Sequence, residues 1–372
     1  MTVGIDKLAF FVPSFVLEMD ELAAARGVDP AKFHIGLEID EMAVNPNTQD
    51  IITFAANAAT KILEPSDLSA IDLVILGTES STDESKSGAV ILHDLLGIQP
   101  FARSVEMKEA CYGATAGLLM ACDYVSRNPA RKALVIASDI ARYGLNSAGE
   151  PTQGAGAVAM LISENPRLLE LDDASVSLTQ DVYDFWRPFG ELYPRVAGKL
   201  SNETYIESFT KVFTEYARRF DKSLDDFAAL AFHTPYPKMG KKALSALTDS
   251  PKLLSALAKA VSYSRRVGNL YTGSLYLSLI SLLENSQTLK AGDTIGLFSY
   301  GSGTVSEFFS GQLVAGYEKM LAKSDNLAML DARVKLSISE YEKMYQETIE
   351  TADNTPFSIE KIENGIRTYH VD

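Results

Sequence analysis

The chain contains one strand-and-helix pattern twice, and this repeat restricts its fold more than any other feature of the sequence. In the first half, the apolar strand pattern IDLVILGT ends just before Glu79, and an apolar helix pattern begins 32 residues later at Cys111. In the second half, FAALAF ends just before His233, and a helix pattern begins 36 residues later at Asn269. Ligands of α/β sheets bind outside the carboxyl ends of strands, so we expect these four side chains to converge by pseudo-symmetry.

Each helix pattern is followed by a second apolar strand and then by a Gly-rich turn into a third strand. The second strands are ALVIAS and TIGLFS, and the turns begin GAGAVA and GSGTVS. We therefore predict an α/β protein of two pseudo-symmetric halves, residues 1–166 with the candidate nucleophile and residues 167–372. The more polar and aromatic segment 168–220 is interpreted as an insertion over the site, and a charged, helical C-terminal extension begins near residue 316.

The first of these turns, residues 154–159, has the outline of a dinucleotide-binding fingerprint. Such a fingerprint follows a strand and opens a helix. Here a polar loop precedes the glycines, and Pro166 comes soon after them. We therefore expect the glycines to shape a hairpin instead.

Composition excludes several classes of protein. The 372 residues are 46% hydrophobic, which is enough for a large core, but no apolar run approaches the roughly 20 residues of a membrane span. A net charge of −15 argues against nucleic acid and anionic membranes as partners. The N-terminus lacks a signal-peptide pattern and two cysteines cannot form a disulfide framework, so we expect a cytoplasmic protein. Four histidines without metal-ligand spacing predict no metal site.

Cys111 is the candidate nucleophile. It lies in the sequence EACYGATAG between a strand pattern and a helix pattern, where the helix dipole and free N–H groups favour a negative charge. Such a position is expected to lower the pKa of the thiol and to favour covalent catalysis. The alternative is a small buried side chain, as most free cysteines are. Cys122 lies eleven residues further along the same helix, about 16 Å away, so the two cannot form a disulfide.

Three further residues are candidates for proton transfer or substrate contact, each with a plainer alternative. His233 is either a structural hydrogen-bonding residue or a group that transfers a proton to a carbonyl. Asn269 is either a helix N-cap or a catalytic amide, and the two roles are compatible. Glu79 is either an exposed turn carboxylate or, if partly buried, a base with a raised pKa.

Charged residues near these candidates have similar alternatives. Lys238 and Lys242 are either solvated surface residues or ligands of phosphate groups. Binding an anion to so acidic a chain would require local positive charge, which these lysines could provide. Asp139 follows the strand ALVIAS, and Asp184 lies at the start of the aromatic stretch YDFWRP. Taken singly, both aspartates are expected to be structural.

Several motifs in this order resemble the 3-hydroxy-3-methylglutaryl-CoA (HMG-CoA) synthase family. They are EACYGAT, YDF, GKLS, HTPYxK and FSYGSG, and they extend over nearly the whole chain except its last 50 or so residues. The length resembles the shorter bacterial form. The resemblance implies a thiolase-like fold with a layered α-β-α-β-α core, a homodimer, and a place in mevalonate and isoprenoid synthesis. It also implies CoA thioesters as substrates, with no other cofactor.

The resemblance further implies a role for each candidate residue. Acetyl-CoA would acetylate Cys111, Glu79 would remove a methyl proton, and the carbanion would attack the ketone of acetoacetyl-CoA. His233 would donate a proton to the developing alkoxide, and water would release the product. The remaining implied roles are an oxyanion hole at the N–H groups of Cys111 and Ser302, binding of the second acyl chain by Asn269, neutralisation of CoA phosphates by Lys238 and Lys242, and lining of the acyl site by Asp139, Tyr143 and Asp184.

Other chemistries remain as alternatives. A degradative thiolase would need a second cysteine near the C-terminal Gly-rich turn, and GSGT has none. A decarboxylating ketoacyl synthase would use Cys111, His233 and Asn269 but would not need Glu79. A non-catalytic CoA-binding scaffold is the third alternative.

Overall fold

The fold is a two-fold repeat built on one continuous mixed sheet. This computed structural model describes residues 2–348 and 355–371. Within them, nine strands pair in the order β11-β12-β13-β8-β1-β7-β6-β4-β5. Their bounds in that order are Ala229–Phe232, Thr294–Gly301, Val305–Leu313, Leu169–Thr179, Val3–Phe11, Gly154–Glu164, Lys132–Ala141, Ile71–Gly77 and Arg103–Met107.

The two halves of this sheet repeat the same strand directions. In the first half, β4 runs parallel to β5 and β6, while β7 runs antiparallel to β6 and β1. In the second half, β11 runs parallel to β12, while β13 runs antiparallel to β12 and β8. Among the described strands, the two half-sheets pair through a short antiparallel contact between β1 and β8, in which Gly4 and Ile5 face Glu170 and Leu169. The internal repeat expected from the sequence is therefore present.

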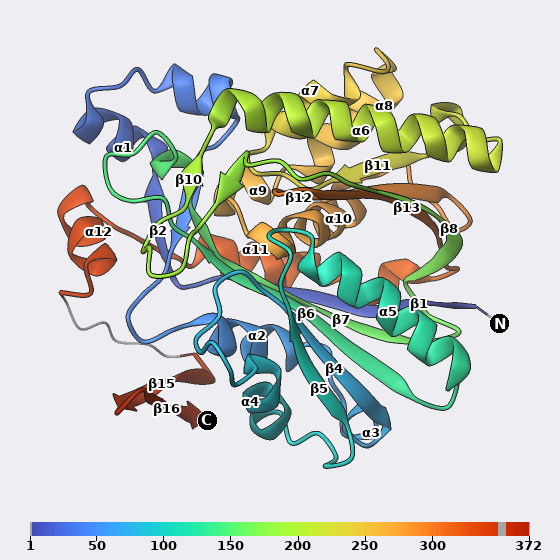
Figure 1. Cartoon of the computed structure of the whole chain (residues 1–372), viewed down its shortest axis with the longest axis horizontal. Coiled ribbons are helices and arrows are strands. Elements are labelled where there is room, and N and C mark those ends of the chain that lie inside the picture. Colours follow the sequence, from blue (N-terminus) through green and yellow to red (C-terminus); the bar gives the residue numbers. More distant parts are fainter. Residues whose placement is uncertain (1, 349–354, 372) are drawn as a thin grey trace.

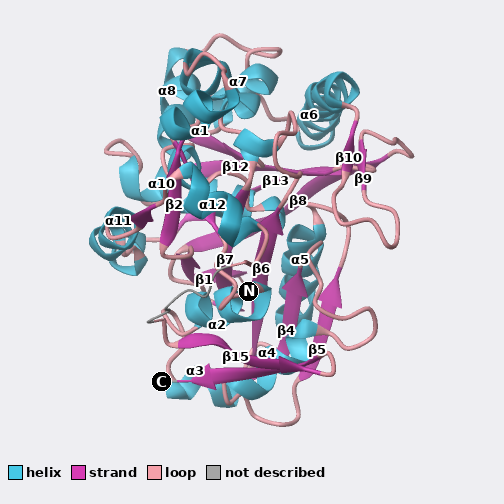
Figure 2. Ribbon diagram, turned by 90° about the vertical axis from the view of Figure 1, so that its left-hand side faces the viewer, coloured by secondary structure: helices cyan, strands magenta, loops and turns pink. Residues whose placement is uncertain are grey.

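Helices cover both outer faces and fill the space between the two half-sheets (Figures 1 and 2). Helices α5 and α10 lie in the middle, α2, α3 and α4 cover the first half-sheet, and α6, α7 and α8 cover the second. This is the α-β-α-β-α layering expected of a thiolase-like fold. The bounds of these helices are α2 Ile51–Ala59, α3 Pro65–Ala70, α4 Gly88–Leu95, α5 Gly113–Arg127, α6 Gly198–Phe220, α7 Lys238–Leu244, α8 Pro251–Ala260 and α10 Ser274–Asn285.

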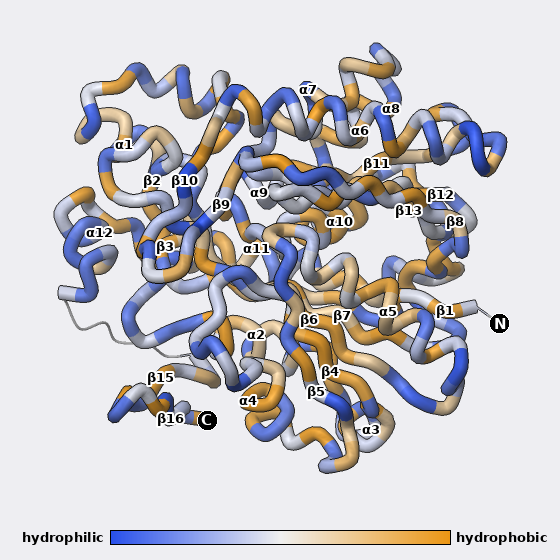
Figure 3. Tube along the Cα trace, in the orientation of Figure 1, coloured by the Kyte–Doolittle hydropathy of each residue, from blue (hydrophilic) through white to orange (hydrophobic). Residues whose placement is uncertain are grey.

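Apolar strands and central helices account for the core. Orange, hydrophobic stretches follow β4, β6, β7 and α10, whereas the outer loops are mostly blue (Figure 3). All nine residues of α2 are buried, and its first turn is closed by a capping box between Asp50 and Thr53. Each fully buried Ile or Phe of such a helix contributes roughly 1.5–3 kcal/mol. The hydrophobic pattern therefore determines the layers.

The segment 168–220 differs from the insertion expected there. Its first part is β8, which pairs along β13, and its last part is α6, which covers the second half-sheet as α2 covers the first. Only residues 180–197 lie outside the repeated unit. They form a ribbon of β9 (Phe185–Trp186) and β10 (Arg195–Val196). The segment looked like an insertion because β8 alternates polar and apolar residues and α6 is charged on its outer face.

The glycines at 154–159 begin β7, a strand, and no helix follows them, so the hairpin interpretation is confirmed. The chain after residue 316 is partly helical, as expected, and ends in a hairpin. No helix among the described residues combines the length and apolar character needed to cross a membrane. The remaining α-helices and strands are α1 Met19–Arg26, β2 Phe15–Glu18, β3 Glu41–Val44, α9 Ser264–Val267, α11 Lys323–Asp331, β14 Val334–Lys335, α12 Ile338–Tyr345, β15 Phe357–Glu363 and β16 Ile366–Val371.

Candidate active site

Cys111 lies in the short turn between β5 and α5. Helix α5 begins two residues after it, and Ala110 just before it has a left-handed backbone with φ of 40°. The turn into α10 has the same shape, because Tyr271, with φ of 44°, also lies three residues before the first helical residue. The repeat therefore matches Cys111 with Thr272, and not with Asn269 as the sequence spacing suggested.

The end of β4 lies directly against the first turn of α5. A side chain at Gly77 would place its Cβ 2.5 Å from the main-chain nitrogen of Ala114, so only glycine fits there. This close approach brings Glu79, two positions after β4, to the turn that carries the cysteine. The Sγ atom of Cys111 donates a hydrogen bond to Oε1 of Glu79 over 3.2 Å.

The pKa of Cys111 is raised well above its usual value, and not lowered as expected from its place near a helix start. Burial is the main cause, and the negative charge and hydrogen bond of Glu79 add to it. A thiolate beside a carboxylate in a buried turn is disfavoured by both effects, which together outweigh the helix dipole. The proton therefore rests on the thiol, and Glu79 is the group placed to take it.

Glu79 is a partly buried carboxyl with a pKa raised to about 8. Burial is the first cause, the nearby charge of Asp139 is the second, and the hydrogen bond from Cys111 and the charge of Arg187 act in the opposite direction. A carboxyl in this range exchanges its proton near neutral pH. The structure thus supports the second of the two sequence interpretations of Glu79.

Asp139 is fully buried and holds the loop that carries Glu79. Its Oδ1 accepts hydrogen bonds from the Thr78 hydroxyl, the Glu79 main-chain N–H and the Ser80 hydroxyl, each over 2.9 Å. Its Oδ2 accepts from the main-chain N–H of Thr272 over 3.1 Å and from the Thr272 hydroxyl over 2.5 Å. The carboxylate therefore connects the two halves at the level of the cysteine, and burial raises its pKa to about 6.

His233 follows β11 and is almost fully buried. Burial alone lowers its pKa to about 3, so the imidazole is neutral at physiological pH. Its main-chain N–H donates to the Phe298 carbonyl over 2.8 Å, whereas its side-chain Nδ1 has no hydrogen-bond partner in the described part of the chain. A buried, unpaired ring nitrogen argues against a purely structural role.

Asn269 caps the turn before α10 and also faces a tyrosine. Its Oδ1 accepts from the Tyr271 main-chain N–H and the Ser274 hydroxyl, both over 2.8 Å. Its Nδ2 is 3.5 Å from the hydroxyl of Tyr143. The helix itself begins at Ser274, after a 3-10 turn over Tyr271–Gly273, which is later than the sequence pattern indicated. Asn269 therefore combines a capping role with a side-chain contact to Tyr143.

Asp184 fixes the Gly-rich turn after β12. Its carboxylate is fully buried and accepts from the Tyr300 hydroxyl over 2.7 Å and the Gly303 main-chain N–H over 3.0 Å. A side chain at Gly301 would lie 2.6 Å from the carbonyl oxygen of Glu109, so this turn packs directly on the cysteine turn. The contact brings Ser302 next to the turn that carries Cys111.

Lys238 and Lys242 lie apart from these groups, at the start of α7. The Nζ of Lys238 donates to the Ile35 carbonyl over 2.7 Å. The Nζ of Lys242, which is exposed, donates to the Tyr236 hydroxyl over 2.8 Å and lies 5.0 Å from the centre of that ring. Neither lysine forms an ion pair with a carboxylate among the described residues, so both charges are available to an anion.

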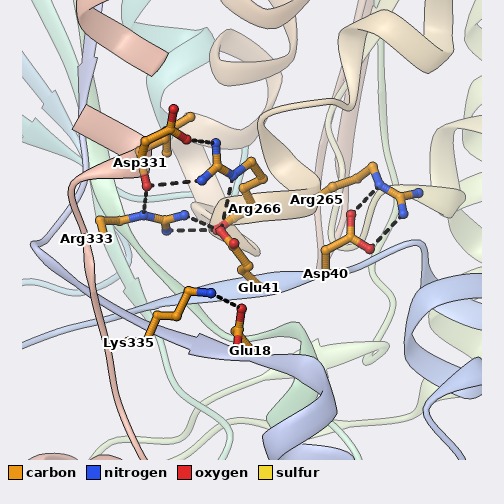
Figure 4. A network of polar contacts seen from close by, with 9 residues as sticks. Glu18, Asp40, Glu41, Arg265, Arg266, Asp331, Arg333 and Lys335 are labelled. Carbon is orange, nitrogen blue, oxygen red and sulfur yellow. Dashed lines mark hydrogen bonds and ion pairs between the residues drawn. The ribbon is translucent and has the colours of Figure 1, made fainter. Parts of the chain in front are cut away.

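Ion pairs fix the helix that leads into Asn269. Arg265 and Arg266 of α9 pair with Asp40 over 2.8 Å and with Glu41 over 3.2 Å, respectively, at the edge of β3 (Figure 4). Buried Arg333 from the C-terminal region joins the same Glu41 over 2.5 Å. These contacts attach α9 to the N-terminal strands and to the segment after α11.

Two residues near Glu79 were not singled out in the sequence. Nη2 of Arg187 donates to the Glu79 carbonyl over 2.5 Å, and Thr272 binds Asp139 as described. Arg187 belongs to the stretch YDFWRP, which contributed only Asp184 to the sequence analysis. Thr272 could have been found by aligning the two helix entries residue by residue. The described residues contain no cluster of three or more His, Cys, Asp or Glu side chains that could hold a metal.

A repeated five-layer fold with a cysteine before the first central helix, bonded to a carboxylate, defines the class of thiolase-like condensing acyltransferases. Comparison with known families makes this specific. Residues 1–166 match the family of the hydroxymethylglutaryl-coenzyme A synthase N terminal, and residues 170–259 and 252–368 match that of its C terminal. The chain belongs to the HMG-CoA synthase family.

Individual relatives agree with this assignment. The chain is 60% identical to a hydroxymethylglutaryl-CoA synthase of Enterococcus faecalis, with 99% of this chain and 100% of that one covered. Among solved structures, it is similar to an HMG-CoA synthase complexed with CoA, with a TM-score of 0.98, 46% identity and full coverage of both chains. It is also similar to MvaS in complex with 3-hydroxy-3-methylglutaryl coenzyme A, with a TM-score of 0.90, 36% identity and coverage of 100% and 99%.

Proposed function

We propose that this chain is an acyltransferase that condenses acetyl-CoA with acetoacetyl-CoA and water to HMG-CoA and CoA, in the mevalonate pathway. The observation that carries the proposal is the hydrogen bond between the Cys111 thiol and a carboxyl whose pKa lies near neutrality. It provides a nucleophile and a base in contact, which a non-decarboxylating condensation requires. The family membership of the whole chain supports the same reaction.

In the first step, Sγ of Cys111 attacks the carbonyl carbon of acetyl-CoA. The thiol proton passes to ionised Glu79, and the C–S bond to CoA breaks after the new C–S bond forms. The departing CoA thiolate takes this proton from Glu79, which leaves free CoA, an acetyl thioester on the enzyme and Glu79 ionised again. The contact over 3.2 Å supports direct transfer between these two side chains.

In the second step, ionised Glu79 removes a proton from the acetyl methyl group. The thioester oxygen gains negative charge, which the main-chain N–H groups of Cys111 and Ser302 would stabilise because the two turns pack together. The methylene carbon then attacks the ketone of acetoacetyl-CoA. Neutral His233 donates its ring proton to the resulting alkoxide, a role supported by the lack of a hydrogen-bond partner at Nδ1 among the described residues.

In the last step, water attacks the acyl-Cys111 thioester and releases the free carboxylate end of HMG-CoA. One proton of this water goes to the sulfur and the other leaves with the product acid. The proton that Glu79 took from the methyl group is returned to His233, which restores the starting state of the enzyme. The oxygen of water enters the product carboxylate and its two hydrogens leave as protons. No atom changes its oxidation state at the expense of an outside reagent, so the proposed steps require no oxidant, metal or further cofactor. Apart from water, we propose CoA thioesters as the substrates.

The remaining residues take supporting roles in this proposal. Tyr143 and Asn269 would contact the second acyl chain, and Lys238 and Lys242 would neutralise CoA phosphates. The carboxylates of Asp139 and Asp184 are already engaged by protein donors, so we propose that they position the site and do not contact substrate directly.

We also propose that the chain acts as a cytoplasmic homodimer. Strand β5 is the edge of the sheet and pairs only with β4 among the described strands. Phe101, just before this strand, is 91% exposed. An unpaired edge beside an exposed aromatic ring supports pairing with a second copy of the chain. Light scattering coupled to gel filtration measures the mass directly.

Intact mass spectrometry after incubation with acetyl-CoA alone tests the covalent mechanism. The wild type is expected to gain one acetyl group, C122A is expected to gain it too, and C111A is not. E79A is expected to form the adduct much more slowly than wild type, because Glu79 takes the thiol proton, and not to condense the adduct with acetoacetyl-CoA once it has formed. A wild-type protein without an adduct would refute the mechanism, and turnover of malonyl thioesters without Glu79 would establish a decarboxylating synthase instead.

A further inference from the structure

Two tyrosines of the C-terminal helix α12 reach the wall of the site, although no sequence motif marks this helix. The Tyr345 hydroxyl donates to Oε1 of Gln153 over 3.0 Å and accepts from the Gly144 main-chain N–H over 2.9 Å. The Tyr341 hydroxyl accepts from Nε2 of Gln153 over 2.8 Å. Tyr341 is 1% exposed and Tyr345 is 7% exposed. These hydrogen bonds are therefore shielded from water.

Gln153 connects α12 to the residues proposed to hold the second acyl chain. Its Oε1 accepts, in addition, from the main-chain N–H of Tyr143 over 2.8 Å. The residues on either side of Gln153 both contact Asn269. The Thr152 carbonyl accepts a hydrogen bond from the Asn269 main-chain N–H over 3.3 Å. Gly154 packs so closely on the Asn269 carbonyl that a Cβ would not fit there. One buried amide thus holds both Tyr143 and the start of the turn that carries Asn269.

The ring of Tyr345 fixes the same region by packing. It stacks on Tyr193 with ring centres 6.2 Å apart, and the guanidinium of Arg142 lies 4.8 Å from its centre. Tyr193 comes from residues 180–197, the segment outside the repeated unit. The ring therefore lies between that segment and the loop that carries Tyr143.

The cysteine and its base are held independently of α12. Asp139 positions Glu79 through contacts to Thr78, Ser80 and Thr272, and none of these residues bonds to α12. Cys111 is positioned by the packing of β4 against α5. Loss of a contact at α12 should consequently affect the second substrate and leave acetylation unchanged.

We propose that Tyr345 is a positioning residue for the acetoacetyl-CoA site, acting through Gln153 and the main chain of residues 143–144. The proposal rests on the function proposed above. In this arrangement the C-terminal helix sets the KM for acetoacetyl-CoA and has no part in forming the acetyl-enzyme.

The test compares Y345F with wild type in two separate reactions. Acetylation of Cys111 by acetyl-CoA alone, followed by rapid quench and intact mass, is expected to proceed at the wild-type rate. The KM for acetoacetyl-CoA is expected to rise about three- to tenfold, as for the loss of one buried hydrogen-bonding hydroxyl, while kcat stays within about twofold. Equal changes in both reactions, or an unchanged KM, would overturn the proposal.

A matched control separates positioning from general stability. Tyr216 on α6 is also buried, and its hydroxyl pairs over 2.9 Å with the hydroxyl of Ser310 on β13. Y216F should lower the thermal midpoint about as much as Y345F but leave the KM unchanged. In addition, the double variant Q153L/Y345F should raise the KM no more than Q153L alone, because both act on one path. If wild type itself forms no acetyl-enzyme, the proposed function fails and not this assignment.

Discussion

Glu79 should make the wild-type protein less stable as the pH rises, and E79Q should remove most of this dependence. The pKa of Glu79 is 4.5 in an ordinary environment and about 8 in the folded protein, because of burial first and the charge of Asp139 second. The folded state therefore holds one more proton than the unfolded state between these two values. Stability falls wherever the unfolded state binds fewer protons, so it falls as the pH rises from 4.5 to 8.

The size of this effect follows from the same shift. At about 1.4 kcal/mol per pKa unit, the shift from 4.5 to about 8 corresponds to ~5 kcal/mol, fully developed above pH 8. Glutamine cannot ionise, yet its Oε1 can still accept the hydrogen bond from Cys111. The difference in unfolding free energy between E79Q and wild type should therefore grow with pH, in favour of the variant, by as much as ~5 kcal/mol.

Urea unfolding at a series of pH values between about 5 and 9 measures this difference. The control is E109Q, since Glu109 lies in the same turn and burial also raises its pKa, but without a neighbouring carboxylate among the causes. Its difference from wild type should vary less with pH than that of E79Q. Parallel curves for wild type and E79Q across the whole range would refute the reasoning.

Three further outcomes are expected. R187M should move the acid limb of the condensation pH profile to higher pH, because the Arg187 charge lowers the pKa of Glu79 and the base must be ionised to act; an unmoved limb would contradict this. G301A should destabilise the fold by about 1–3 kcal/mol and slow condensation, because its Cβ would lie 2.6 Å from the Glu109 carbonyl; unfolding midpoints check it. K242A should raise the KM for both CoA substrates, and less so at high salt, where the exposed charge is screened; an equal rise at all salt concentrations would argue against a phosphate contact.

Much of the fold was predictable because its determinants are local. Short apolar or glycine patterns predict the strand before Glu79, the helix after Cys111 and the Gly-rich turns. Because the same pattern occurs twice, it also predicts the layered arrangement. The sequence spacing aligns the repeat incorrectly by a few residues at the second helix, because Asn269 is a good N-cap residue that comes before the actual start of the helix at Ser274. Left-handed backbone at Ala110 and Tyr271 shows the true match, and a sequence does not display φ angles.

The electrostatics of the site could not be predicted in the same way. A cysteine near the start of a helix is expected to have a lowered pKa. The direction of the pKa shift, however, also depends on the burial of the thiol and on the charged group within hydrogen-bonding distance, which here is Glu79. Likewise, the five hydrogen bonds that Asp139 accepts come from two segments distant from it in sequence, residues 78–80 and Thr272. The contribution of Tyr345 has no local signature, because a tyrosine on a charged amphipathic helix is commonplace.

Burial shifts the pKa values of the proposed acid, His233, and the proposed base, Glu79, in opposite directions, which has a consequence for the enolate of the proposed mechanism. It raises the pKa of Glu79 to about 8 and lowers that of His233 to about 3, so both groups favour their neutral forms. A charged imidazolium would hold the enolate tightly and reduce its reactivity toward the ketone. A neutral imidazole can still donate a proton to the more basic alkoxide. The less basic enolate oxygen needs only hydrogen bonds, which main-chain N–H groups can donate. In the proposed mechanism, the same desolvation that keeps the thiol protonated therefore matches each proton donor to the oxygen that it would stabilise.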